Sequence, residues 1–368
     1  MSEKGKQAGV EERKDLLLAH GHSPNTDAGG NSTRPPSCSV CIANYNGIDL
    51  IGPCIESVIA QDFNLPVEII VHDDASSDES VSFIRTRYPT VKLIPSKENV
   101  GFCVSNNRMA EQARGEYLLL LNNDAILRPD AIKTLYEFAS KQETPGILGI
   151  PQYDLGTGEL LDIGDRLDLF LNSVPNRERK IQEVGQIMGA CLWVPRRLWH
   201  ELGGFPAWFG SLAEETYLCC LARLKGYSVT ALPTSGYDHL VGGSFGGGRL
   251  VGGRMRTSYR RRALAERNKS FTMAICYPSP YFYVIFPLHL SVLALEGLLL
   301  SCIKRDLTLW RQVYVNCMRE LWTNRKKLKQ HRRDAQKYVG CGPDFWKRHT
   351  VTPHKLKMLI GHGLPRIE

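Results

Sequence analysis

The sequence lacks the glycine-rich loops with which many nucleotide-binding proteins hold phosphates. Its first apolar run, residues 40–43, ends in Asn44-Tyr45-Asn46-Gly47 rather than in Gly-x-Gly-x-x-Gly. No Gly-x-x-x-x-Gly-Lys followed by Ser or Thr comes after any apolar run. Because both kinds of phosphate site need glycine at fixed spacing, a Rossmann-type dinucleotide site and a P-loop are both disfavoured.

An apolar segment near the start is also missing. The opening residues, Met1 to Gln7, are polar, and no apolar core of a secretion signal follows them. We therefore expect the 11 cysteines to be free thiols in a reducing cytoplasm. Cys38 and Cys41 form a Cys-x-x-Cys pair. In a strand this spacing points the two side chains to opposite faces, so we do not expect a zinc site there.

A long uninterrupted apolar run is missing as well. Residues 271–303 are strongly apolar, but a membrane-spanning helix needs about 20 apolar residues with few charges. Five residues interrupt the run: Pro278, Pro280, Pro287, His289 and Glu296. We expect helices that lie at the bilayer surface, with a true span as the alternative.

Lysine and arginine are abundant just after this run, between residues 304 and 333. Beside an apolar segment they fit the anionic cytoplasmic leaflet, which predicts peripheral attachment to the inner face of the membrane. Nucleic-acid binding is the rival interpretation of this basic patch. No nucleic-acid reader motif accompanies it, so we do not expect a nucleic-acid partner.

The chain has 368 residues, of which 43% are hydrophobic and 23% are charged. This is enough for one large domain with a buried core and an additional module. We expect a disordered leader over 1–36 and the main domain over 37–268. A helical membrane-associated module would follow over 269–335 and a tail over 336–368. The net charge of +8 concentrates after residue 245.

Four short apolar runs alternate with helical patterns in the main domain. The runs are 40–43, 67–71, 91–94 and 117–121, and each ends in polar residues. This alternation predicts an α/β fold with a mostly parallel sheet that is buried on both faces. Ligands of such sheets bind outside the carboxyl ends of the strands, so we expect the polar strand ends to converge on one cleft.

Eight short motifs follow one another along the chain. They are Ala43-Asn44-Tyr45-Asn46, Asp73 to Asp78, Asn99 to Phe102 with Asn106-Asn107, Leu119 to Asp124, Gly189 to Val194, Gly203-Gly204-Phe205, Glu214-Glu215 to Tyr227, and His239 with Gly243-Ser244. In this order they resemble the inverting GT-A glycosyltransferases of family two, particularly the rhamnosyltransferase-like branch, over residues 37–335. The resemblance implies a GT-A fold, with a mostly parallel central sheet flanked by helices and a Rossmann-like nucleotide-binding half.

The resemblance also implies an activity. A sugar would move from a nucleoside diphosphate sugar to a hydroxyl of a glycan or glycolipid acceptor, with inversion, in cell-surface polysaccharide synthesis. Rhamnose from a thymidine diphosphate donor is indicated by the branch alone.

Such a donor carries a diphosphate, and a divalent cation stabilises the charge that develops on it when the sugar leaves. Mg²⁺ and Mn²⁺ prefer oxygen ligands and need only one or two protein carboxylates. The resembled family supplies them from an Asp-x-Asp triplet, where this chain has Asn122-Asn123-Asp124. The resemblance therefore implies a metal on Asp124 with His239 as helper. The alternative is that Asp124 only ends a turn before a helix.

The strand ends also carry candidates for holding the nucleotide. Tyr45 is placed to stack on the base, and Asp73 or Asp74 to accept from its imino N–H, which suits a pyrimidine. The alternative for both aspartates is an Asx-turn at the strand end. The remaining nucleotide candidates are Ala43, Asn44, Asn99, Gly101, Asn107, Asn122 and Asn123.

Inverting transfer needs a base that takes the proton of the attacking hydroxyl. The resembled family places this base in a Glu-Asp pair at the start of a helix, and here the pair is Glu214-Glu215. Glu215 is therefore the candidate catalytic base, one methylene longer than the usual Asp, and Glu214 a candidate contact to the acceptor or the diphosphate. The alternative is that both glutamates only interact with the helix dipole.

A glycine-rich stretch, residues 242–253, follows the last strand motif. It is either a lid that orders over the donor or a plain connector. Ser244, Arg249 and Arg254 are its candidates for contacts to the acceptor or the diphosphate.

Two other functions stay open. A sugar-phosphate nucleotidyltransferase would need a loop rich in glycine and basic residues after the first strand, which Asn44-Tyr45-Asn46-Gly47 does not offer. A catalytically degenerate transferase that serves as a membrane scaffold would account for Asn122 and Glu215, where the family has aspartate.

Overall fold

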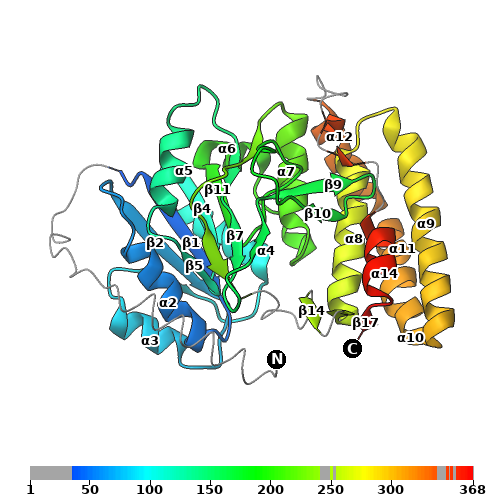
Figure 1. Cartoon of the computed structure of the whole chain (residues 1–368), viewed down its shortest axis with the longest axis horizontal. Helices are drawn as coiled ribbons and strands as arrows, with labels where there is room; N and C mark the ends of the chain where they lie inside the picture. The colour runs from blue at the N-terminus through cyan, green and yellow to red at the C-terminus, as the bar shows by residue number, and fades with distance from the viewer. Residues whose placement is uncertain are drawn as a thin grey trace.

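The computed structural model describes residues 35–240, 249–251, 254–337, 345–347, 349–350 and 354–367. Nearly all of the predicted leader lies outside the described residues, and so does Ser244. Figure 1 shows an α/β part and, beside it, a bundle of helices from the C-terminal third of the chain.

A seven-stranded sheet forms the centre of the α/β part. Its order is β12-β6-β11-β4-β1-β2-β3. The strands are β1 (Cys38–Asn44), β2 (Val67–Asp73), β3 (Lys92–Pro95), β4 (Tyr117–Asn122), β6 (Ile147–Gly149), β11 (Cys191–Pro195) and β12 (Val229–Ala231). Neighbours are parallel except where β11 pairs with β4 and with β6. The predicted α/β sheet is confirmed, as a mixed sheet in which β11 runs against its neighbours.

The register of this sheet aligns the polar strand ends. Asn44 pairs with Asp73 at the end of β2, and Ala43 pairs with Asn122 at the end of β4. The strands can be apolar throughout because helices cover both faces. Cys38 and Cys41 accordingly belong to the hydrophobic cores of opposite faces.

Helices of the α/β part divide between the two faces. On one face lie α2 (Ile48–Ile59), α3 (Ser80–Arg87) and α5 (Ala131–Ala139). On the other lie α4 (Phe102–Gln112), α6 (Arg196–Leu202) and α7 (Glu214–Leu224), with the short 3-10 helix η1 (Ala207–Phe209) before α7.

Three smaller sheets occur within the described residues. One contains β5 (Ala125–Leu127), β13 (Tyr237–His239), β7 (Gln152–Asp154) and β8 (Leu160–Asp162). The others are β10 (Ser173–Pro175) with β9 (Asp165–Asp168) and β16 (His349–Thr350), and β14 (Arg249–Val251) with β15 (Arg254–Thr257) and β17 (Arg366–Ile367). The first of them matters most for the site, because it pairs His239 with Ala125, the residue after Asp124.

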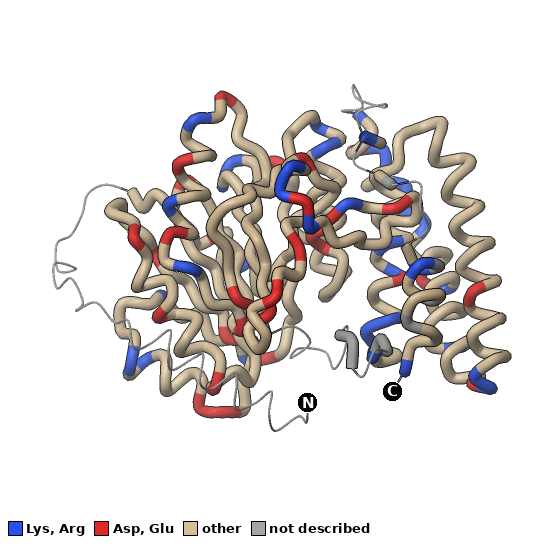
Figure 2. The backbone as a smooth tube through the Cα atoms, viewed as in Figure 1, with Lys and Arg blue, Asp and Glu red and all other residues tan. Residues whose placement is uncertain are grey.

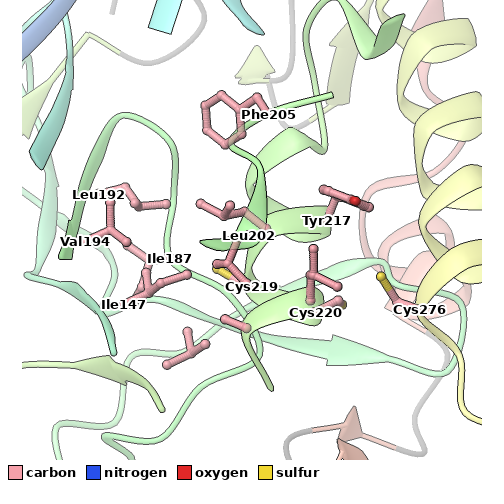
Figure 3. Packing of buried hydrophobic residues seen from close by; sticks show 14 of the residues in the cluster. Ile147, Ile187, Leu192, Val194, Leu202, Phe205, Tyr217, Cys219, Cys220 and Cys276 are labelled. Carbon is pink, nitrogen blue, oxygen red and sulfur yellow. The ribbon is translucent and has the colours of Figure 1, made fainter. Parts of the chain in front are cut away.

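Helix α8 (Tyr259–Cys276) joins the two parts of the molecule. Phe271, Met273 and Ile275 are buried in the same core as α7. Figure 3 shows Cys220 of α7 close to Cys276 of α8 in this packing. The predicted boundary between residues 268 and 269 falls inside α8, and residues 271–276 lie in the core rather than at a surface.

The rest of the bundle is formed by α9 (Tyr281–Lys304), α10 (Leu307–Leu309), the π-helix η2 (Trp310–Val315), α11 (Asn316–Thr323), α12 (Arg325–Gln336) and α14 (His354–His362). Among the described residues, α9 is the one helix that is long and apolar enough to cross a membrane, judged by length and composition alone.

The two sides of helix α9 differ in the side chains that they carry. Its inner side carries polar groups: His289 is within 2.8 Å of the Ser270 hydroxyl, and Glu296 accepts from Arg262 and Lys355. Its outer side carries exposed apolar residues: Val284, Leu288, Val292, Leu295, Leu299 and Ile303. The inner side also carries Leu293 and Leu300, which are buried in the core of the bundle. Helix α9 is therefore apolar on both sides, and the apolar residues of its outer side are exposed.

Candidate active site

The ends of β1, β2 and β4 are joined by side-chain hydrogen bonds. Asn44 donates through Nδ2 to Asp73 Oδ2 at 2.9 Å, and its Oδ1 accepts from Asn123 Nδ2 at 2.8 Å. Three predicted site residues are thus held together by the strand register, with Ala43 beside them. Tyr45, the residue after β1, is 53% exposed, so its ring is accessible for stacking.

Asp73 holds a local turn that resembles its alternative assignment, but its backbone partner is three residues on rather than the two of an Asx-turn. Its carboxylate accepts from the Ser76 backbone N–H at 3.0 Å and from the Ser76 hydroxyl at 2.7 Å, besides Asn44. The side chain is buried and already has three donors. Its first role is therefore to shape the loop after β2.

Asp74 holds the loop before α4. Its two carboxylate oxygens accept from the backbone N–H groups of Val100 at 2.7 Å and Gly101 at 2.9 Å, and Asn99 donates to its carbonyl at 3.3 Å. Gly101 has φ +86°, a conformation in which a side chain would be strained. Asp74, Asn99 and Gly101 are therefore brought together at the start of α4.

Asn107 lies elsewhere in the hydrogen-bond network. Its amide donates to the Phe205 carbonyl at 2.8 Å and accepts from the Phe205 N–H at 3.0 Å. The residue thus holds α4 to the Gly204–Phe205 turn, and its hydrogen bonds do not connect it to the strand-end residues.

The two candidate metal ligands lie side by side. His239 Nε2 is 3.0 Å from Asp124 Oδ1 and 3.5 Å from Asn122 Nδ2. The contact arises because β13 pairs with β5, and Leu240 N–H also donates to the Asp124 carbonyl at 3.1 Å.

This pair is an incomplete set of metal ligands. The described residues contain no group of three or more His, Cys, Asp and Glu that could share an ion. One carboxylate and one imidazole nitrogen fit a hard cation that takes its other ligands from water and phosphate oxygens, as Mg²⁺ does when it binds with a phosphorylated substrate.

The loop before α7 has a strained backbone. Gly210, Leu212 and Ala213 all have positive φ, at 75°, 73° and 61°. For the two non-glycine residues this conformation is unfavourable by roughly 1–2 kcal/mol each. Such a loop persists only when its surroundings hold it, and it delivers Glu214 and Glu215 to the first turn of α7.

The pKa of Glu215 is raised to about 7, first by burial and then by the nearby Asp165, while a backbone hydrogen bond and the Arg261 guanidinium oppose the shift. Burial and the neighbouring Glu215 also raise the pKa of Glu214 well above its ordinary value. A carboxyl with a pKa near 7 is half ionised at neutral pH, which is the condition under which a general base is most effective.

The glutamate pair lies against the start of α4. A Cβ on Gly189 would stand 3.8 Å from Glu215 Cβ and 3.9 Å from the Phe102 ring. The Cys103 N–H donates to the Gly210 carbonyl at 3.0 Å. The loop that carries the candidate base therefore touches the loop that Asp74 holds.

The basic candidates of the C-terminal half are only partly placed. Arg249 and Arg254 occupy the β14–β15 hairpin, and their side chains lie outside the described residues. Two arginines further along, on α8, have internal partners: Arg262 donates to Glu296 and to the Tyr314 hydroxyl, and Arg267 donates to the Phe209 carbonyl.

Sequence reasoning did not find the polar network beside Glu215. Asp165 accepts from Gln186 Nε2 at 3.1 Å, and the Thr216 hydroxyl donates to Gln186 Oε1 at 2.6 Å. These residues come from three separate segments, and no local motif marks any of them.

Comparison with known proteins finds a family match in the α/β part of the chain. Residues 39–192 match Glycosyl transferase family 2. The succinoglycan biosynthesis protein ExoO of Rhizobium meliloti is 33% identical over 105 residues, 28% of this chain and 30% of that protein. The poly(ribitol-phosphate) beta-glucosyltransferase of Bacillus spizizenii is 30% identical over 118 residues, 30% of this chain and 18% of that protein. The chain thus spans about a third or less of the length of these relatives.

Two solved structures share the fold. S. aureus TarS 1-349 superposes with a TM-score of 0.52 at 18% identity, over 82% of this chain and 89% of that one. GalNAc-T7, solved with UDP, GalNAc and Mn²⁺, superposes with a TM-score of 0.55 at 16% identity, over 89% of this chain and 66% of that one. Both likenesses extend beyond the matched domain and into the helical bundle.

Proposed function

We propose that this chain moves a sugar from a nucleoside diphosphate sugar to a hydroxyl of a glycan or lipid-linked acceptor, with inversion, in polysaccharide synthesis. The match of residues 39–192 to Glycosyl transferase family 2 supports this proposal. The observation that carries the proposal is the contact between two loops. One is held by Asp74 at the strand ends, and the other carries Glu215, whose pKa is raised to about 7.

The donor would bind along the strand ends. Tyr45 offers an exposed ring for the base, and Asn122 and Asn123 offer amide groups for the ribose. Asn44 is buried and holds Asp73 and Asn123 in place. Asp124 and His239 would hold a Mg²⁺ or Mn²⁺ ion, which supplies Lewis-acid stabilisation of the departing diphosphate.

Glu215 would act as the general base. It accepts the proton of the acceptor hydroxyl while that oxygen bonds to the anomeric carbon from the side opposite the leaving group. The bond from the anomeric carbon to the diphosphate oxygen breaks, and its electron pair leaves with the nucleoside diphosphate. Because Glu215 must be ionised, activity should rise with pH through about 7.

Two variants test this proposal. Glu215→Gln should lower kcat by about 10²- to 10⁴-fold and leave Mn²⁺-dependent binding of UDP, GDP or dTDP unchanged in a thermal-shift assay. Asp124→Ala should weaken that binding. Glu201→Gln, at an exposed glutamate on α6, is the matched control.

The opposite outcomes would identify the alternatives. A wild-type chain that binds a nucleotide but turns over no nucleotide sugar with either metal would support the scaffold hypothesis, which Asn122 and Glu215 favour. Formation of a nucleotide sugar from a sugar phosphate and a nucleoside triphosphate would identify a nucleotidyltransferase.

The apolar face of α9 supports attachment to a membrane surface. Along this face Val284, Leu288 and Leu295 are more than half exposed. Lys304 and Arg305 stand at its end, and Figure 2 shows Lys and Arg spread over the neighbouring helices. An apolar stripe flanked by cations matches a bilayer that contains anionic lipids.

Flotation with vesicles tests this attachment. Vesicles that contain phosphatidylglycerol should carry the chain, vesicles of phosphatidylcholine alone should carry less, and Leu295→Glu with Leu299→Glu should abolish the difference. Ile59→Glu changes an equally exposed apolar residue on α2 and should have no effect. Loss of a dimer in the double variant, without any vesicle binding by the wild type, would assign the face to a second copy instead.

A further inference from the structure

A buried asparagine of the helical bundle reaches into the loop that carries the candidate base. Asn268, on α8, has no solvent exposure. Its Nδ2 donates to the backbone carbonyls of Phe209 at 3.1 Å, Ser211 at 3.0 Å and Leu212 at 2.7 Å. These partners are 56 to 59 residues away along the chain.

The backbone carbonyls of this loop need hydrogen-bond donors. Its left-handed residues, Gly210, Leu212 and Ala213, turn the carbonyls of 209, 211 and 212 away from any regular ladder. A buried carbonyl without a donor destabilises the fold. The Phe209 carbonyl accepts from the Ser211 N–H within the loop at 2.9 Å, so the carbonyls of Ser211 and Leu212 are the ones that depend on donors from outside it. The amide of Asn268 has two N–H bonds, and it shares them among the three carbonyls.

The orientation of that amide is also determined. Arg267 Nε donates to Asn268 Oδ1 at 3.0 Å, so the oxygen faces the guanidinium and the NH₂ group faces the loop. Arg267 Nη2 donates in addition to the Phe209 carbonyl at 2.7 Å. Two consecutive residues of α8 therefore hold the same loop.

The other side of the loop is held from the donor half. The Cys103 N–H donates to the Gly210 carbonyl, and the Asp74 carboxylate accepts from Gly101 two residues earlier. The loop is thus fixed between the start of α4 and α8, and Glu215 follows it directly. Without the α8 contacts, the bond from the Cys103 N–H would still anchor the loop to the start of α4.

We propose that Asn268 is the positioning residue of the candidate base: through three carbonyls it holds the 209–213 loop in the strained conformation that places Glu215 next to the donor site. This inference rests on the proposed function of Glu215. It also means that the helical bundle takes part in the transfer site through α8.

The test compares Asn268→Ala with Tyr277→Phe. Tyr277, at the end of α8, is as buried as Asn268 and donates one hydrogen bond to the Leu169 carbonyl, in a different loop. Each variant thus removes a buried donor to a backbone carbonyl, but only the first does so at the base loop. The chain is used at full length, with Mn²⁺ and the nucleotide sugar that gives turnover in a donor panel.

We expect Asn268→Ala to lower kcat by roughly 100-fold, as a misplaced catalytic group does, with little change in the donor KM. In the wild type, kcat should rise with pH around the Glu215 pKa of about 7. In Asn268→Ala this rise should occur at lower pH, because water that reaches Glu215 stabilises its charged form and lowers its pKa. Tyr277→Phe should leave kcat and its pH profile unchanged. The inference would be overturned if the two variants lowered kcat equally and the kcat–pH profile of Asn268→Ala matched that of the wild type.

Hydrogen exchange gives a readout that needs no activity. Asn268→Ala should speed amide exchange over residues 209–217, and Tyr277→Phe should not. Unchanged exchange would refute the positioning role even if the proposed function holds. Faster exchange in a chain that transfers no sugar would refute the function alone. If Asn268→Ala does not fold, Arg267→Gln leaves Asn268 in place but frees its amide, and should produce the same changes to a smaller extent.

Discussion

The donor side and the base side of the candidate site are built in different ways. On the donor side, Asn44, Asp73 and Asn122 stand at the ends of adjacent strands, so the sheet register itself brings them together. On the base side, Glu215 follows a loop with three left-handed residues, which α4 and α8 hold from outside.

This difference separates two kinds of preorganisation. The strand ends are positioned by a ladder of many backbone hydrogen bonds, so the loss of one side chain changes little in the backbone. The base loop is positioned by a few tertiary contacts at an unfavourable backbone conformation, so each contact matters more. The same conformation buries a carboxylate and raises its pKa.

We expect the largest effect on stability from a change at Asp74, whose side chain holds a backbone loop on the donor side. Asp74→Ala removes the acceptor of two backbone N–H groups and should destabilise the fold by about 3 kcal/mol in denaturant unfolding. It should also weaken nucleotide binding. Asp78→Ala is the control, because Asp78 also accepts from two backbone N–H groups, those of Ile48 and Ser80, but at a more exposed position. An equal effect of both changes would contradict the anchoring role of Asp74.

A second prediction concerns how the ionisation of Glu215 lowers the stability of the folded protein. The folded-state pKa of Glu215 is raised, so its contribution to stability is full below the ordinary carboxyl pKa and is lost as the pH rises through about 7. Glu215→Gln should therefore raise the Tm by a few degrees at pH 8, with almost no difference at pH 4.5. A Tm difference independent of pH would show that burial does not oppose ionisation of this group.

Arg261 should have a smaller effect, confined to the base side. Its charge favours the ionised form of Glu215, so Arg261→Gln should raise the pKa of Glu215 and move the acid limb of kcat to higher pH. Above the limb, kcat should recover. Arg260→Gln, one residue earlier and exposed, is the comparison. A lower kcat at every pH would indicate that Arg261 contacts the substrate instead.

The smallest change is expected from Asn122→Asp on the donor side. A second carboxylate beside Asp124 should increase the affinity of the nucleotide-free chain for Mn²⁺, measured by calorimetry, since divalent cations are attracted by ligand charge. With the donor diphosphate present the gain should shrink, because the diphosphate already supplies negative oxygens. Unchanged affinity without nucleotide would argue against a metal at Asp124.

Much of the fold could be read from the sequence. The four apolar runs became β1 to β4 and the helical pattern after Asn99 became α4, because period and composition are local properties. The same reasoning could not place β11 against its neighbours. It also treated 271–303 as one apolar surface segment, whereas Phe271 and Ile275 of α8 are core residues and α9 exposes the apolar residues of its outer side. Apolar composition alone does not tell which side of a helix is covered.

The residues of the candidate site also fall into those that local sequence predicts and those that depend on tertiary packing. The sequence by itself determined which polar residues end the strands and that a glutamate pair opens a helix, since these depend on neighbours within a few residues. The family resemblance paired His239 with Asp124, and the structure adds the direct contact between them. Only the tertiary structure decided that Asn107 bonds Phe205 and that Asn268 holds the base loop. Each of these contacts joins residues about 60 to 115 positions apart, and the chain brings them together only when the sheet and α8 have packed.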